Sequence, residues 1–208
     1  SFKETLKKAT ELGYAESNPS SDINGDDVAA KVKILSSLSF NSFINKNIHV
    51  EGIKDIDEQD IINTNKLGYK IKLMGFSEIL NNKLFQRVHP TLVKKKSYIA
   101  SVNGVLNAVI VDGKPIGKNI IQGEGAGPSA TSSALISDIS SIMRGNIKFP
   151  FTISNKKRKN FLSGKISDLY FSSYIRLNVK DKYGILSDVT KVFSNHKVSI
   201  KRVLQNPY

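Results

Sequence analysis

The sequence predicts an α+β fold that is followed, near the end of the chain, by a smaller β-α-β unit. Three observations support this prediction. Apolar residues recur at helical spacing before residue 68 and alternate with polar residues from Tyr69 onward. They then form a strand-helix-strand pattern of about 30 residues between Tyr174 and Val203.

The first third of the chain predicts three helices, each with residues suited to a helix terminus. Ser1 and Glu4 have the spacing of a capping box, Asp57 is a suitable N-cap, and Gly13 and Gly68 suit the residue that follows a helix. The predicted helices cover residues 1–12, 25–40 and 57–67, with a short strand at 48–53.

The middle of the chain predicts two hairpins and one more helix. The first hairpin pairs residues 69–78 with 84–93 across Asn81-Asn82. After a connecting turn at 97–103, a second hairpin over 106–111 and 114–121 turns at Asp112-Gly113, a strong turn dipeptide. A helix over 129–144 follows a glycine-rich loop, Gly123–Gly127.

The last quarter predicts a linker and the β-α-β unit. Residues 146–170 have weak periodicity, and their charge run, Lys156–Lys159, is compatible with a nucleic-acid contact or with a solvated linker. A strand at 174–179, a helix at 185–195 and a strand at 198–203 follow. Two strands with one uncovered face are rarely stable alone, so we expect a truncated unit or one that pairs with another chain.

The composition excludes several classes of protein. It is 39% hydrophobic and 24% charged, with no apolar run long enough to span a membrane and no signal-peptide pattern. Because the chain has no cysteine, disulfides and thiolate metal sites are excluded, and a cytoplasmic location is the simplest interpretation. The formal charge of +13 suits a nucleic acid, an anionic membrane surface or a phosphorylated small molecule, and it decides nothing alone.

One polar cluster stands out as a candidate for chemistry. Asp27 and Lys31 are four residues apart on one predicted helix, and Glu16 lies on the loop before it. One interpretation is a solvated helix face with a weak surface ion pair. The other is a site in which an amine, tuned by burial and nearby carboxylates, donates a proton and the carboxylate pair beside it also holds a substrate ammonium group.

Two other patterns are weaker. Gly123-x-Gly-x-Gly127 before a helix is compatible with an anion-binding loop or with a tight turn that binds nothing, and it is not the dinucleotide fingerprint. The histidines, His49, His89 and His196, are isolated and lack metal-ligand spacing, so we expect no metal site.

Several dispersed motifs together resemble the homoserine dehydrogenase family over residues 1–144, and the last unit is similar to the first half of an ACT regulatory module. The motifs occur in the family's order: Glu11–Glu16, Asn18-Pro19, Asp22–Gly25, Asp27–Lys31, Glu51–Ile53, Leu67–Leu73, Arg87–Pro90, Asn103–Ala108 and Gly123–Gly127.

The resemblance implies a mixed sheet with helices on one face and the NAD(P)-dependent interconversion of aspartate 4-semialdehyde and L-homoserine, in threonine, methionine and isoleucine biosynthesis. Lys31 would be the proton donor, Glu16 and Asp27 would bind substrate, and Gly13 and Gly127 would lie against the cofactor, NADP or NAD. It also implies a homodimer or a higher homo-oligomer, possible regulation by threonine, and neither a nucleic acid nor a membrane as partner. The domains would be residues 1–145 (catalysis and dimerisation), 146–170 (linker) and 171–208 (partial ACT).

The chain departs from the family pattern before Ser1, where no strand, glycine-rich loop and helix of a Rossmann domain occur. We therefore expect the C-terminal portion of an enzyme that is inactive alone. The alternative from another class is a non-catalytic, ACT-containing module that senses a ligand or binds a partner.

Overall fold

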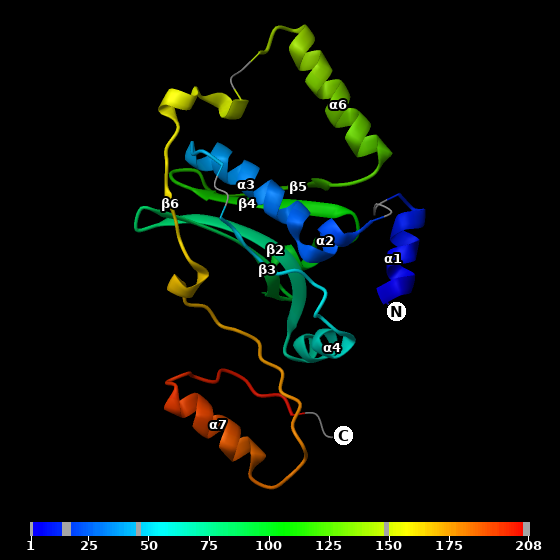
Figure 1. Ribbon diagram of the computed structural model, residues 1–208. Coiled ribbons are helices and arrows are strands. Elements are labelled where there is room, and N and C mark those ends of the chain that lie inside the picture. The colour runs from blue at the N-terminus through cyan, green and yellow to red at the C-terminus, as the bar shows by residue number, and fades with distance from the viewer. Residues whose placement is uncertain (1, 14–17, 45–46, 148–149, 206–208) are drawn as a thin grey trace.

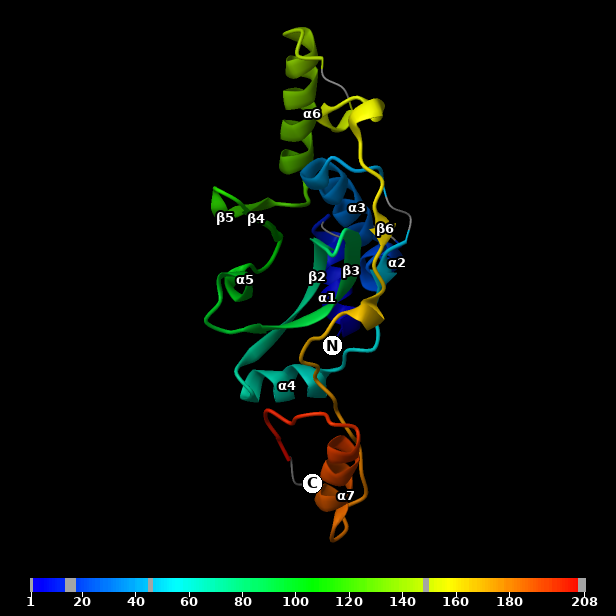
Figure 2. The ribbon, with the colours of Figure 1, turned by 90° about the vertical axis from the view of Figure 1, so that its left-hand side faces the viewer.

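The computed structural model describes residues 2–13, 18–44, 47–147 and 150–205. The expected Ser1–Glu4 capping box lies partly outside these residues. Along the chain the elements are α1 (Phe2–Glu11), α2 (Ser20–Asn24), α3 (Asp26–Phe40), β1 (His49–Val50), α4 (Glu58–Lys66), β2 (Tyr69–Leu80), β3 (Lys83–Lys94), α5 (Tyr98–Ser101), β4 (Leu106–Gly113), β5 (Gly117–Glu124), α6 (Pro128–Met143), β6 (Leu162–Ser163) and α7 (Ile185–Asn195). The expected α+β fold is confirmed, with α2 and α3 on one face of the central sheet (Figures 1 and 2).

The central sheet is organised around the long hairpin β2–β3. The two strands pair antiparallel from Tyr69 opposite Lys94 to Leu80 opposite Lys83. Asn81 and Asn82 form the two-residue turn, with φ values of 49° and 61°. Positive φ at both turn residues matches the twist of the flanking strands, and asparagine tolerates it. The predicted hairpin is therefore confirmed, including its turn.

Two short parallel strands complete this sheet along the edge of β3 that β2 leaves open. β1 pairs His49 with Arg87, and β6 pairs Leu162 with Lys83. The expected strand at 48–53 is shorter than predicted, although the Glu51 N–H still donates to the Val88 carbonyl at 2.8 Å.

The core lies between α3 and this sheet. Ala29 and Val32 on α3 are buried against Val88 of β3, which is fully buried. Gly75 of β2 lets the helix approach closely, because a Cβ there would overlap the Val32 side chain. The apolar positions of α3 thus fix which side of the helix faces the sheet.

The second hairpin forms a separate two-stranded sheet, and its turn differs from the prediction. Asp112 pairs with Lys118, and Gly113 pairs with Gly117, so residues 114–116 make the turn rather than Asp112-Gly113. Pro115 has no N–H to donate to a ladder, which favours placing it in the loop. Gly117 accepts the positive φ of 75° that the return requires.

Part of the segment predicted as a linker packs against the body of the protein. The Arg158 Nη2 donates to the Ser42 carbonyl at 2.6 Å and to the Ser37 hydroxyl. The same guanidinium lies 5.0 Å from the centre of the Phe43 ring and 4.5 Å from that of Phe151. Arg158 is therefore an anchor for this segment and not a solvated charge.

The C-terminal unit contains its predicted helix but not its predicted strands. α7 covers Ile185–Asn195, as expected, whereas residues 174–179 and 198–203 form no strand. Isolated two-stranded pairings are marginal in water, which accounts for the difference. The expected β-α-β unit is wrong in this respect, because the structure has no strand in either flank.

Candidate functional site

The candidate site lies where α2 ends and α3 begins. Gly25 serves both helices: its N–H donates to the Asp22 carbonyl at 3.3 Å, and its carbonyl accepts the Ala29 N–H at 2.9 Å. Its φ of 86° reverses the chain, and a Cβ there would lie 3.3 Å from Val50 and from Val88. A glycine is required by conformation and by space, and it sets where α3 starts.

Asp27 and Lys31 form the ion pair that their spacing predicts. The Lys31 Nζ lies 2.6 Å from the Asp27 Oδ2, and their side chains are 54% and 41% exposed, respectively. Because Asp27 and Lys31 immediately precede Val28 and Val32, which pack onto the sheet, the pair lies on the flank of α3 beside the buried stripe. The pair is open to a small molecule, and the ammonium group keeps donors beyond the one that Asp27 uses.

The Asp27–Lys31 pair fits both a surface ion pair and a site for proton transfer. Exposed pairs of this kind contribute about 0.2–1 kcal/mol to stability, so stability is a weak reason for their presence. The arrangement has the parts for proton transfer: an ammonium donor, a carboxylate that orients it, and access from solvent. Glu16, the third expected member, lies outside the described residues.

The two glycines expected at a cofactor lie at helix termini. Gly13 follows α1 with a φ of 73°, and no described residue other than its chain neighbours has a heavy atom within 4 Å of a Cβ built there. Gly127 precedes α6 with a φ of 107°, and its carbonyl accepts the Thr131 N–H at 3.2 Å. Both positions leave bare backbone next to a helix terminus, the arrangement that lets a ligand approach closely.

The middle of the glycine-rich loop has a structural explanation. A Cβ at Gly125 would overlap the Asn107 side chain, and the Gly125 N–H donates to the Val105 carbonyl at 3.1 Å. This glycine is thus needed for the loop to lie against the start of β4, whatever the loop binds.

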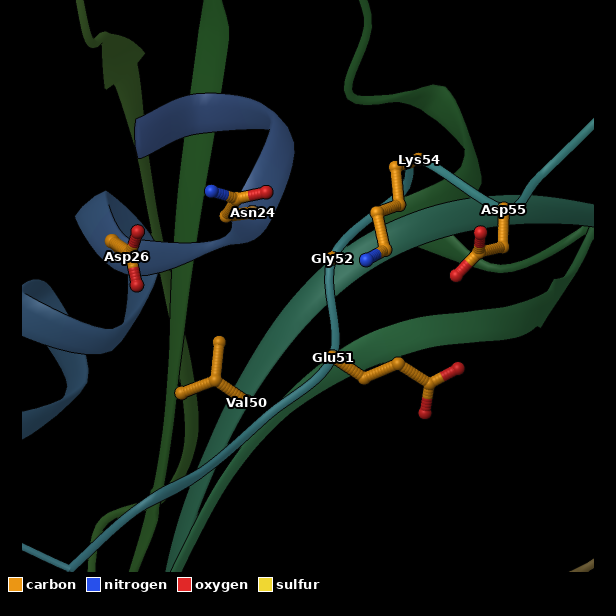
Figure 3. A pocket seen from close by; sticks show the side chains of 7 residues that line it. All are labelled: Asn24, Asp26, Val50, Glu51, Gly52, Lys54 and Asp55. Carbon is orange, nitrogen blue, oxygen red and sulfur yellow. The ribbon is translucent and has the colours of Figure 1, made fainter. Parts of the chain in front are cut away.

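A cavity of about 380 Å³ lies beside the joint between α2 and α3 (Figure 3). In Figure 3, Asn24 and Asp26 lie on the helical side, and Lys54 and Asp55 extend from the loop that follows β1. The lining residues are Asn24, Asp26, Val50, Glu51, Gly52, Lys54 and Asp55. Of the predicted site residues that the structure describes, none lines this cavity, although Asp26 directly precedes Asp27.

Lys72, on β2, is a lysine with a perturbed environment. The pKa of Lys72 is lowered, first by burial and second by the charge of Lys70. Its Nζ donates to the Val102 carbonyl and to the Asn103 Oδ1, the latter at 3.2 Å. These donors hold the turn that leads into β4, so we assign Lys72 a structural role.

The histidines do not form a metal site in the described ranges. His89 stacks between Phe76 and Phe171, with ring centres 5.3 and 6.0 Å away, respectively. Within residues 2–13, 18–44, 47–147 and 150–205, no group of three or more histidine, aspartate and glutamate side chains is arranged to hold a metal. In the same ranges, none of the helices has the length and apolarity to cross a bilayer.

Comparison with known proteins gives a consistent picture. Residues 1–140 match the sequence model of the family described as homoserine dehydrogenase. The chain is 35% identical over 211 residues to the homoserine dehydrogenase of Bacillus subtilis, covering 99% of the chain and 48% of the relative. It is also 35% identical over 206 residues to that of Helicobacter pylori, with the same coverage of 99% and 48%. The chain thus spans about half the length of the curated relatives it matches.

Solved structures agree with the sequence matches. A homoserine dehydrogenase from Thiobacillus denitrificans has a TM-score of 0.75 and 32% identity, covering 98% of this chain and 49% of that one. A hyperthermophilic archaeal homoserine dehydrogenase mutant in complex with NADPH has a TM-score of 0.54 and 26% identity, covering 70% of this chain and 41% of that one.

Proposed function

The chain belongs to the homoserine dehydrogenase family, and from that premise we propose that it forms the substrate-binding and catalytic portion of such an enzyme. The reaction is the NAD(P)-dependent interconversion of aspartate 4-semialdehyde and L-homoserine, a step in threonine, methionine and isoleucine synthesis. The observation that carries the proposal is the 2.6 Å pair between Lys31 and Asp27 at the start of α3. We place the enzyme in the cytoplasm.

Lys31 is the proton donor in this proposal. Its Nζ gives a proton to the aldehyde oxygen, which becomes the hydroxyl oxygen of homoserine, and takes a proton back in the reverse direction. Asp27 holds the ammonium group of Lys31 in place. Together with Glu16, Asp27 also binds the polar end of the substrate. Carboxylates are suited to that end because it carries an ammonium group.

A nicotinamide cofactor, NADPH or NADH, supplies the hydride when bound. The bare backbone at Gly13 and at Gly127 fits a group that lies flat against the protein, and the open space around Gly13 supports this fit. We propose that Gly13 and Gly127 lie against the cofactor. Glu16, Asp27 and Lys31 then contact the substrate.

The test is the rate of NADPH oxidation with aspartate semialdehyde in the longest natural polypeptide that carries these residues. Lys31→Met is expected to lower kcat/KM by about 10²–10⁴-fold, the contribution of a positioned acid. Asp27→Asn is expected to raise KM and lower kcat together. Lys33→Met on the same helix is the matched control and should change kcat/KM less than twofold.

A Lys31→Met variant that keeps more than a tenth of the wild-type kcat/KM would contradict the role of Lys31 as the proton donor. The absence of NADPH oxidation in the wild-type polypeptide would instead favour the other class of function, a module that senses a ligand without catalysis.

We also propose a homodimer or a higher homo-oligomer. The β4–β5 hairpin exposes large apolar side chains, among them Ile116 at 73% and Ile121 at 66%. A two-stranded sheet is marginal alone, so a second copy is a suitable cover. Sedimentation equilibrium measures this, and a monomer at micromolar concentration would contradict it.

Threonine is proposed as an effector through the C-terminal unit, on its similarity to an ACT module. Calorimetry with threonine tests this, and the absence of heat at millimolar ligand would argue against it.

A further inference from the structure

The segment after β1 is in contact with the backbone at the end of α2. A Cβ built at Gly52 would overlap the Ile23 carbonyl oxygen and lie 2.7 Å from the Asn24 Cα and 2.8 Å from the Asn24 carbonyl carbon. All three are backbone atoms, so no side chain can rotate away to make room. Space, rather than a left-handed conformation, requires glycine here.

Hydrogen bonds on both sides of Gly52 hold this contact. The Ile53 N–H donates to the Ile23 carbonyl at 2.8 Å, and the Glu51 N–H donates to the Val88 carbonyl at 2.8 Å. The segment therefore fastens the end of α2 to the central strand β3. Figure 3 shows Gly52 on this segment, with Asn24 on the adjoining helical turn.

The fastened backbone leads directly into α3. Asn24 is followed by Gly25, which caps α3, and Asp27 is the second residue of that helix. Lys31 lies one turn further on and is tied to Asp27. Because a helix moves as a rigid element over one turn, the position of Ile23 and Asn24 sets the position of the Lys31–Asp27 pair.

We propose that Gly52 is a positioning residue for Lys31: by packing without a side chain against Ile23 and Asn24, it sets the place of the proton donor. This inference rests on the proposed function and deepens it. Relieving the overlap that a methyl group creates requires a displacement on the order of 1 Å, and a misplacement of that size costs about 10²-fold in rate.

The test is a double-mutant cycle between Gly52→Ala and Lys31→Met in the longest natural polypeptide that carries these residues. Gly52→Ala alone is expected to lower kcat by about 10–100-fold. In the Lys31→Met background the same change should alter kcat less than threefold, because residues that act through one group are not additive. If Gly52→Ala acted only on the structure in general, it would lower kcat by the same factor with and without Lys31.

Gly164→Ala is the steric control. A Cβ at Gly164 would overlap the Phe85 ring, so this variant also disturbs packing, but at β6 and away from the start of α3. It is expected to lower the thermal unfolding temperature and to keep kcat within twofold.

Asn24→Gly provides a variant that adds no atom and loosens the joint. It is expected to lower kcat by about 3–10-fold, again only while Lys31 is present, so the proposal stays testable if Gly52→Ala does not fold. Wild-type kcat in Gly52→Ala, or an equal loss in both backgrounds, would overturn the role of Gly52. Full activity in Lys31→Met would instead overturn the role proposed for Lys31, on which this inference rests.

Discussion

The sheet beneath α3 and the unit around α7 have similar apolar patterns, but they are held together in different ways. In the sheet, Leu84 is 2% exposed and Val88 is fully buried, and every residue of β2 has a partner on β3. In the C-terminal unit, Leu186 and Val192 of α7 are 51% and 57% exposed, respectively. The helix α7 forms in both the expected place and length without burial, whereas the strands expected beside it do not pair.

The C-terminal unit contacts the rest of the protein through the stacking of Phe171 on His89 and through polar contacts at α4, beside which it lies in Figure 1. Arg176 lies 2.6 Å from the Asp57 carboxylate and 3.3 Å from that of Asp60. The Tyr174 hydroxyl donates to Asp60 at 3.1 Å, and the Arg202 Nη1 donates to the Leu67 carbonyl at 2.7 Å. We call these contacts the α4 latch.

The largest expected effect tests the difference in burial. Leu84→Ala should lower the free energy of unfolding by about 2–5 kcal/mol, because it leaves a cavity in a packed core. Val192→Ala, a comparable truncation on the exposed face of α7, should change it by no more than about 0.5 kcal/mol. Urea unfolding measures both. Equal losses would show that α7 is buried in solution.

The next effect tests the latch. Arg176→Gln removes the charge that contacts Asp57 and Asp60, so the C-terminal unit should detach more often. Limited proteolysis within residues 171–184 is expected to become several-fold faster, while amide exchange in β2 and β3 stays unchanged. Lys182→Gln, an exposed change in the same segment, is the control. Equal cleavage of both variants and wild type would contradict the latch.

The smallest effect is a dependence on pH. The hydrogen bond from Arg176, followed by the Asp60 N–H, lowers the pKa of Asp57 to about 2. Because the folded pKa lies below the unfolded value of about 3.9, the contribution of Asp57 is complete above about pH 4 and is lost as the pH falls towards 2.

Hydrogen exchange in the first turn of α4 should therefore be constant above about pH 4, after correction for intrinsic rates, and increase below it. Asp57→Asn keeps a capping oxygen and should remove this dependence. The groups that face Asp57 are Asp60 and Arg176, and Tyr174 faces Asp60. Burial, first among its causes, raises the pKa of Tyr174, so this hydroxyl stays protonated throughout the window.

Local sequence predicted the elements whose determinants are local. Asp57 and Asp60 form a complete capping box at α4, and Gly68 follows that helix with a φ of 87°. The Asn81-Asn82 turn sets the register of β2 and β3, and spacing alone predicted the Asp27–Lys31 pair.

Elements that depend on distant contacts were not predicted. The helix α2 has only five residues, and its end is held by the segment around Gly52. The two-residue strand β6 exists because it pairs with β3. The role proposed for Gly52 likewise depends on its contact with the backbone of Ile23 and Asn24. The motif Glu51–Ile53 contains this glycine, but the sequence does not predict what the glycine contacts.

The outer edge of β3 has a consequence for how the chain avoids aggregation. A strand edge is a template for pairing with another molecule unless something covers it. Here two brief segments, β1 from before the hairpin and β6 from well after it, occupy parts of that edge. During synthesis β1 is available at once, whereas residues 162–163 emerge long after the hairpin is complete. On this edge of β3, the stretch beside the Asn81-Asn82 turn is therefore covered later than the stretch that β1 pairs with.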